Sequence, residues 1–421
     1  MKLVSLHQFV LFFFLGSAVI GYIISYGDFY FFHFVSIIIV ALMALGYIRI
    51  YKESFAATTV FLAIILYSLV SLAWTPNALN GFFVIFYFLN GYLIVFIITN
   101  YARSEIKLNF VFSVLAFFII LNFFVGLIES FGLFRLPMSP YSTQLHTRPS
   151  GFNYNLNNFG FVFLVTFPFL FLYPNKIVKW LAVILAFWFL VKLESKGFFV
   201  GLFFFFALYL IFSIKVKTSL VKFATAIMGV LILSLVVIFP SETIHGDNRE
   251  FLAFSEIERG AGMMLQQDFA NAGSTGVRAQ MYFFGLQELA DTRGFGLGVA
   301  GVGSRLAQET DIFGVDKDFF SFHNFFLELL IDFGIIPFFI LFFAYLILVG
   351  KLLRLAKTIR QERIRYYSLS SALSLMTAFP ASIAPSSIVY VLTFYLMIGF
   401  AIATLNVGSK KLYGACLELR E

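Results

Sequence analysis

Long apolar runs alternate with short polar segments along nearly the whole chain. Each run is long enough to cross a hydrocarbon core of about 30 Å as a helix of roughly 20 residues. This pattern predicts about twelve membrane spans. Their expected limits are 9–26, 29–48, 55–73, 81–99, 109–130, 156–173, 178–193, 197–213, 220–239, 324–349, 367–383 and 387–405. The short pair on either side of Glu194 could instead form a re-entrant hairpin.

The composition agrees with a membrane protein, because only 12% of the residues are charged and the mean hydropathy is +0.93. A soluble protein of this size would carry about a quarter charged residues. Runs such as 198–211 and 338–349 do not alternate between apolar and polar positions, which argues against a membrane β-barrel. The sequence therefore predicts an all-α polytopic membrane protein and excludes a soluble enzyme or a single-span anchor.

The N-terminus imitates a signal peptide, with Lys2, the apolar run 9–24 and small residues at 16–18. The apolar stretch continues well past the small residues, so we expect an uncleaved first span. Cys416 is the only cysteine, which excludes an intrachain disulfide and a metal site built from thiolates.

Basic residues gather in alternate connections between the spans. Lys and Arg in short loops resist translocation, so the side that holds most of the 29 basic residues is expected to be cytoplasmic. This places both termini in the cytoplasm. Outside the one long loop, the opposite face carries only four basic residues, namely Arg135, Arg148, Lys192 and Lys196. The net charge of +7 thus reflects membrane topology and does not indicate nucleic-acid binding.

One long hydrophilic segment, residues 241–322, interrupts the pattern and falls on the external face. A structureless loop of that length is improbable, so we expect a small folded cap over the membrane surface. The chain then divides into a membrane domain at 1–240 with spans one to nine, the cap at 241–322, and a membrane domain at 323–421 with the last three spans and a cytoplasmic tail. A cap on the external face suggests a functional site there.

Two external turns carry candidate ligand-binding residues. The first contains Arg148, a Pro/Gly turn and four asparagines, among them Asn157, and could offer several donors to an anion or a sugar. The alternative is an interfacial arginine followed by a polar helix cap. The second turn, Glu194-Ser195-Lys196-Gly197, places a cation where a lipid phosphate would lie. An ordinary hydrated turn is the alternative there.

Within the predicted cap, Ser274 or Thr275 could cap a helix that continues to Asp291, which would put Arg278 in its first turn. A cation there opposes the helix dipole at a cost of about 0.3–1 kcal/mol. A bound anion would remove the conflict, because Arg278 and the free N–H groups would converge on it. The alternative is a solvent-facing arginine or one paired with Asp268.

The glycine-rich run 294–303 follows this helix. It lacks the Lys-Ser/Thr of a P-loop and the preceding strand of a dinucleotide-binding fold. We therefore interpret it as a turn in which the backbone closely approaches its neighbours and shapes the cap.

His323 and Asn324 lie at the external start of the tenth predicted span, with Glu328 and Asp332 farther along it. An unperturbed histidine pKa of about 6.5 suits proton transfer at neutral pH. The alternative is that His323 only caps the helix or donates a hydrogen bond. No second histidine or acid has ligand spacing to His323, so no metal is expected.

These residues resemble the O-antigen ligase and polymerase superfamily of bacterial membrane glycosyltransferases. The resemblance covers the whole hydropathy layout. It is most specific at Arg278 with the downstream stretch 295–298, and at the box 323–328 followed by Gly334. The external Arg-x-x-Gly with a downstream asparagine also matches, through Arg148.

One departure concerns the short turn before the eighth span, where members commonly have Ser-Arg-Gly and this chain has Ser195-Lys196-Gly197. The positive charge is kept, but the bidentate geometry of a guanidinium is lost. Lys196 can therefore supply the charge but not two parallel hydrogen bonds.

The resemblance implies the architecture of a membrane-embedded glycosyltransferase that needs no cofactor. Its donor would be a glycan on undecaprenyl pyrophosphate, and its acceptor a hydroxyl of the lipid A core or of a growing polysaccharide, at the external face of the bacterial inner membrane. It further implies that Arg278 and Arg148, with Lys196, hold the pyrophosphate and that His323 takes the hydroxyl proton. Asn157 and Asn324 would contribute to substrate binding.

Two functions within the superfamily remain open, a polymerase that joins repeat units and a ligase that delivers finished glycan. A flippase for lipid-linked glycans, or another twelve-span transporter, is the alternative from a different class. Transporters usually show repeated halves and charged or broken helices near the membrane centre. Here the polar residues gather on one face and the long loop has no counterpart in the first half.

Overall fold

The computed structural model describes residues 6–21, 23–26, 29–136, 148–153, 155–193, 195–213, 273–308, 322–383, 385 and 387–418. The predicted ninth span and the first part of the predicted cap lie outside these ranges. The helices are α1 (Leu6–Ile20), α2 (Phe31–Ala44), α3 (Lys52–Ser71), α4 (Ala78–Tyr101), α5 (Glu105–Ser130), α6 (Leu156–Phe171), α7 (Lys176–Leu193), α8 (Lys196–Ser213), α11 (Gly273–Asp291), α12 (Gly301–Gln308), α14 (Phe325–Phe333), α15 (Ile335–Thr358), α16 (Glu362–Ala381), η3 (Ile388–Tyr390) and α17 (Leu392–Glu418). Two short antiparallel strands, β1 (Ser25–Tyr26) and β2 (Phe29–Tyr30), join α1 to α2. The all-α prediction is confirmed for the described residues.

Helices α1 to α8 follow the first eight predicted spans to within a few residues. In the described part of the chain, four helices are long and apolar enough to cross a membrane: α4, α5, α15 and the stretch 392–412 of α17. Shorter apolar stretches of 10–17 residues lie in α1, α2, α3, α6 and α8. The two segments on either side of Glu194 form two separate helices, α7 and α8.

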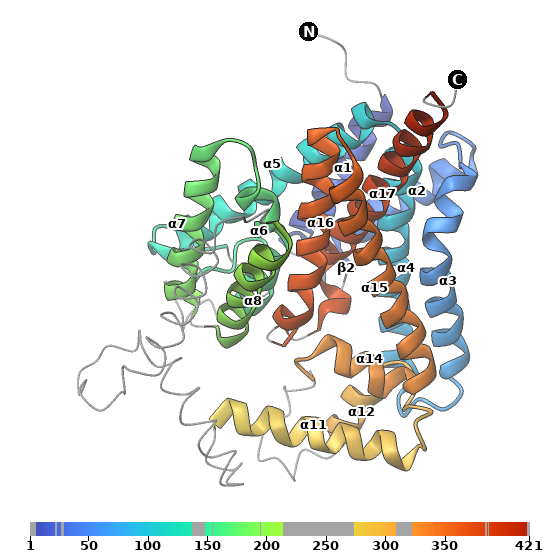
Figure 1. The fold of residues 1–421 in the computed structure, drawn as a ribbon. Helices are drawn as coiled ribbons and strands as arrows, with labels where there is room; N and C mark the ends of the chain where they lie inside the picture. The colour runs from blue at the N-terminus through green and yellow to red at the C-terminus, as the bar shows by residue number, and fades with distance from the viewer. Residues whose placement is uncertain are drawn as a thin grey trace, which may run out of the picture.

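The limits expected for the tenth span, 324–349, are wrong. This range contains two helices, α14 and the start of α15, which are separated by Gly334. Gly334 has a φ of +80°, a left-handed conformation that ends α14. Because both helices are apolar, hydropathy alone does not reveal the break. The long apolar helix begins at Ile335, and α14 turns away from it (Figure 1).

Phenylalanine fills much of the interior. Phe159, Phe163 and Phe167 are fully buried on one face of α6, at the i, i+4 and i+8 spacing of neighbouring helical turns. Phe189 of α7 meets the first two at ring distances of 5.0 and 5.3 Å in edge-to-face geometry, which suits the quadrupoles of aromatic rings. The high phenylalanine content thus serves helix packing in this part of the bundle.

The outer surface is also apolar, whereas part of the interior is polar. Trp180 of α7 and Ile340 of α15 are 66% and 63% exposed, and both belong to a larger set of exposed apolar side chains. By contrast, Ser368 and Thr377 of α16 are fully buried. A surface of this kind would be unfavourable in water and suits a lipid environment. The exposed side chains therefore agree with a membrane location.

The connections between helices separate to two ends of the bundle (Figure 1). The α2–α3, α4–α5, α6–α7 and α15–α16 connections lie at the upper end of the view, with the last turns of α17. The α3–α4 and α7–α8 turns lie at the lower end, together with α11, α12 and α14. The connections predicted to be cytoplasmic thus share one end, and the α7–α8 turn shares the other end with α11, α12 and α14.

Helices α11, α12 and α14, called the outer layer below, have a small core of their own. Its fully or nearly buried members are Met281, Leu289, Leu297, Val302, Leu306, Phe322 and Ile331. An ion pair joins two of the helices, because Nη2 of Arg305 lies 2.9 Å from Oε1 of Glu288. The three helices therefore pack as one layer at the lower end of the bundle.

The glycine-rich turn approaches the backbone at the end of α14 closely, in agreement with the close-approach turn predicted from the sequence. The N–H groups of Leu297 and Gly298 donate to the carbonyls of Ile331 and Asp332 at 3.0 and 2.9 Å. Gly296 has a φ of +84°, and a Cβ there would lie 2.4 Å from the N atom of Gly334. Such close approach is possible only for glycine.

We predict that Gly296→Ala lowers the free energy of unfolding by about 1–3 kcal/mol, since alanine meets both a left-handed backbone and a steric clash. Thermal unfolding of the purified protein in detergent measures the change. Gly350→Ala is the matched control, because a Cβ at Gly350 has no neighbour within 4 Å. Equal effects of the two substitutions would contradict the packing argument.

Candidate functional site

Arg278 lies in α11, but the helix begins earlier than its sequence suggests. The structure starts α11 at Gly273, so the prediction that Ser274 or Thr275 caps it is wrong. Serine and threonine are tolerated within a first turn, and the helix simply includes them. Arg278 is therefore in the second turn, where the helix dipole acts on it more weakly than in the first. Its role depends on its neighbours more than on the dipole.

Arg278 interacts electrostatically with Tyr282, one helical turn further along α11. Burial lowers the pKa of the half-buried Arg278 guanidinium, and the nearby Tyr282 hydroxyl opposes that change. Burial likewise raises the pKa of Tyr282, while Arg278 and the Asn324 side chain act in the opposite direction. An arginine remains charged at neutral pH even so. The structure thus holds a cation next to Tyr282 in a partly desolvated setting.

Tyr282 also fixes α11 on the start of α14. Its hydroxyl donates to the backbone carbonyl of His323 at 3.3 Å. Its ring packs on Phe322, with the centroids 5.2 Å apart. Arg278 and His323, two residues predicted as catalytic, are therefore brought to the same place by one tyrosine.

His323 adopts an uncommon backbone conformation for a residue with a side chain. Its φ is +52°, and it is 7% exposed. A left-handed backbone at a residue other than glycine costs free energy and often occurs at functional sites. Asn324 follows as the N-cap of α14, since its Oδ1 accepts the N–H of Leu327 at 3.2 Å. Asn324, and not His323, is therefore the residue that caps α14.

Asp332, at the other end of α14, has a structural role. Its Oδ1 accepts the N–H of Val302 at 2.8 Å, in the first turn of α12. A carboxylate at this position caps α12 and complements its dipole. Within the described ranges, no group of three His, Cys, Asp or Glu side chains could hold a metal ion.

The second half of the candidate site joins the two external turns predicted from the sequence. Arg148 is half-buried and precedes a turn at 150–153 that packs on α5. Asn157, in the first turn of α6, accepts a hydrogen bond from the Ser195 hydroxyl at 2.9 Å. Lys196 is the first residue of α8, and its side chain lies outside the described part of the structure. The structure thus connects the segments that carry Arg148 and Lys196 through Asn157.

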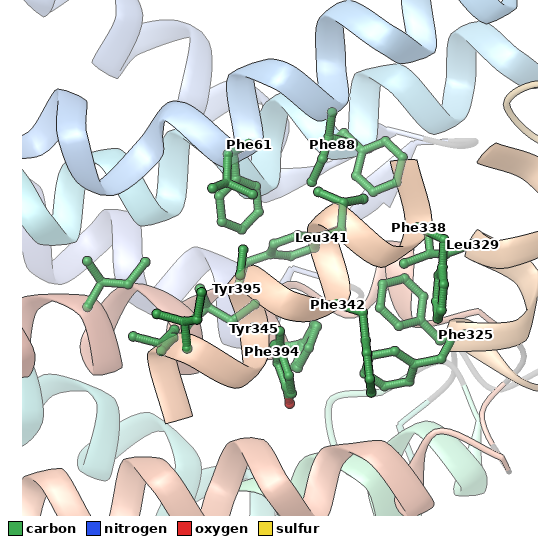
Figure 2. A pocket seen from close by; sticks show the side chains of 18 of the residues that line it. Phe61, Phe88, Phe325, Leu329, Phe338, Leu341, Phe342, Tyr345, Phe394 and Tyr395 are labelled. Carbon is green, nitrogen blue, oxygen red and sulfur yellow. The ribbon is translucent and has the colours of Figure 1, made fainter. Parts of the chain in front are cut away.

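An apolar cavity of about 460 Å³ begins at α14 and continues between α3, α4, α15 and α17. Figure 2 shows Phe61 and Phe88 on one side, and Phe342 and Tyr345 on the other. Along α15 the lining extends from Phe338 to Lys351. At 1.5 Å per residue this distance is about 20 Å, roughly two thirds of a hydrocarbon core.

The cavity starts directly after two predicted site residues, His323 and Asn324. Phe325 and Phe326, which line it, follow His323 and Asn324 in the chain. Nearly all of the other lining side chains are apolar. The arrangement can therefore hold a hydrocarbon chain, with one end at the start of α14.

Three residues of the site were not predicted from the sequence: Tyr282, Glu129 and Asn122. The link that Tyr282 makes from α11 to the start of α14 has no local signal, because its partners there lie about forty positions away. Glu129 and Asn122 do have one, since they are polar residues seven positions apart in an otherwise apolar helix and so lie on one face. Both side chains contact the turn after Arg148.

Comparison with protein families identifies the central part of the chain. Residues 181–343 match the family model described as O-antigen ligase. The match begins within α7, ends within α15 and includes four of the six predicted site residues, leaving out Arg148 and Asn157. No curated protein matches the chain. Over this segment the chain is similar to the O-antigen ligase family, which supports the resemblance predicted from its motifs.

Proposed function

We propose that the protein is a membrane glycosyltransferase that moves a glycan from undecaprenyl pyrophosphate to an acceptor hydroxyl. The acceptor belongs to the lipid A core or to a growing polysaccharide, and the reaction takes place at the external face of the bacterial inner membrane. The observation that carries the proposal is the hydrogen bond from Tyr282 to His323, which sets Arg278 beside the start of α14. The O-antigen ligase match over the same residues supports it.

In the proposed reaction, the acceptor oxygen forms a bond to the anomeric carbon as the bond from that carbon to the pyrophosphate oxygen breaks. The pyrophosphate leaves with the electron pair, and His323 takes the hydroxyl proton. Arg278 and Arg148, with Lys196, balance the charge of the leaving group. Asn324 and Asn157 contribute amide donors, since each already uses its side-chain oxygen within the protein.

The apolar cavity beside α14 suits the hydrocarbon part of the donor. A polyprenyl chain lying against Phe325 and Phe326 would leave its phosphate end near His323 and Arg278. Burial of the chain contributes binding energy far from the reacting atoms. The proposal keeps both termini in the cytoplasm and residues 241–322 as a cap on the external side.

We expect deletion of the protein, followed by analysis of the cell's glycans on gels, to abolish one step of surface polysaccharide assembly. Loss of long chains, with single units still reaching the acceptor, would indicate a polymerase. Complete glycan left on undecaprenyl would indicate a ligase. Lipid-linked units that stay on the cytoplasmic side would contradict the proposal and support a flippase, and an unchanged glycan pattern would also contradict it.

A further inference from the structure

Glu129 is an unexpected residue for its position in the fold. It lies one residue before the end of α5 and is 0% exposed. A helix carries partial negative charge at its C-terminal end, which disfavours a carboxylate there. Burial of an unpaired charge is costly as well. Glu129 therefore depends on hydrogen-bond donors from another part of the chain.

The donors come from the segment that joins α5 to α6. Oε2 of Glu129 accepts the backbone N–H groups of Ser150 and Gly151, each at 2.7 Å. Oε1 accepts the N–H of Leu136 at 3.4 Å. Hydrogen bonds to an ionised acceptor are short and roughly twice as strong as neutral ones. One carboxylate thus holds both ends of this connection against α5.

Asn122 makes the next contact, two helical turns earlier in α5. Its Oδ1 accepts the N–H of Phe152 at 2.6 Å and the side-chain amide of Asn153 at 3.4 Å. Gly151 lies between the two anchors with a φ of +54°, and a Cβ there would lie 2.4 Å from Oδ1 of Asn122. Only glycine allows this approach. Two polar side chains of α5 therefore fix the backbone of the whole turn.

The anchored turn is the base of the second half of the candidate site. Arg148 is separated from Ser150 only by Pro149, whose ring restricts the backbone between them. On the other side of the turn, Asn157 bonds to Ser195, next to Lys196. A shift of the turn would therefore move the Arg148 side chain and loosen its link to the α7–α8 turn.

We infer that Glu129 is a positioning residue whose carboxylate holds the turn from which Arg148 reaches the anionic leaving group. The inference rests on the proposed function and deepens it, because Glu129 itself contacts no substrate. It assigns the charge and the position of the Arg148 turn to two different residues. The arginine supplies charge, and an acid on the preceding helix fixes where that charge lies.

We expect Glu129→Ala to reduce transfer about 10- to 100-fold, the size of effect that follows when buried donors lose a charged acceptor. Glu129→Gln should lose less than about 10-fold, because one amide oxygen can still accept both short hydrogen bonds. Ser130→Ala is the matched control at the same helix end. Its hydroxyl bonds to Leu127 and Trp188 and not to the turn, so transfer should stay near the wild-type rate.

Two further measurements distinguish positioning from general damage. In an Arg148→Ala background, Glu129→Ala should reduce transfer by less than about threefold more, because residues that act together are not additive. In a Cys416→Ser chain, Ser150→Cys places a thiol at a site that is 2% exposed, so a maleimide should label it only when Glu129 is also replaced by alanine.

Several outcomes would overturn the inference. A full additional loss in the Arg148→Ala background would mean that Glu129 acts independently of Arg148. A Ser150→Cys thiol that stays protected in the Glu129→Ala chain would show that the carboxylate does not hold the turn. If no variant and no wild-type protein transfers glycan, the proposed function fails, and the labelling result still decides whether Glu129 anchors the turn.

Discussion

His323→Asn is expected to lower glycan transfer by about two to four orders of magnitude, the usual contribution of a positioned general base. Asparagine tolerates a left-handed backbone better than most residues, so it can keep the φ of +52° while it removes the imidazole. His323→Ala should lose as much activity, but it also replaces a residue suited to that backbone. Comparison of the two variants, His323→Asn and His323→Ala, separates the loss of the imidazole from any change in backbone conformation.

Transfer is measured with membranes that contain matched amounts of each variant. Arg293→Asn is the control, since Arg293 also has a positive φ, of 54°, but lies at the far end of α11. We expect that control to behave like the wild type. Near-normal transfer by His323→Asn at normal abundance would reduce His323 to a structural residue and remove the general base from the mechanism.

Sequence predicts those features of this fold that depend on hydropathy, and it misses those that depend on backbone conformation and on contacts between distant residues. Spans such as α4 and α5 are long, predominantly apolar helices, and hydropathy locates them closely. The break at Gly334 was missed, because apolar residues continue on both sides of it. What ends α14 is a backbone conformation together with the contact to Gly296, and neither changes the hydropathy. Periodic apolar patterns therefore predict which segments are helical better than they predict where a helix turns.

The candidate site divides in a similar way. Residues with distinctive chemistry, such as Arg278 and His323, can be predicted as candidates from type and spacing. The residue that brings them together, Tyr282, was not, because its contacts depend on the packing of α11 against α14. Glu129 is an intermediate case. A buried acid at the end of an apolar helix is visible in the sequence, but its partners are known only once the chain is folded.

Arg278→Ala is expected to remove nearly all transfer, and Arg278→Lys most of it. A planar guanidinium can donate to two phosphate oxygens at once, whereas an ammonium group offers a single compact charge. Donor binding by purified protein in detergent shows where the loss arises, and both variants should bind the lipid-linked donor more weakly. Arg305→Lys is the control, because Arg305 pairs with Glu288 in the outer layer and should affect stability more than donor binding.

The Lys variant should also respond to pH in a way that the wild type does not. Burial disfavours the charged form, which lowers the pKa of a cation, and this effect is present at Arg278. Arginine begins from so high a pKa that it stays charged, but lysine begins near 10.4 and shifts readily when buried. The charge of the Lys variant is therefore lost as the pH rises, so its remaining transfer should fall toward about pH 9 relative to that of the wild type. Unchanged donor affinity in Arg278→Ala would instead mean that Arg278 organises the outer layer through Tyr282 and does not contact the pyrophosphate.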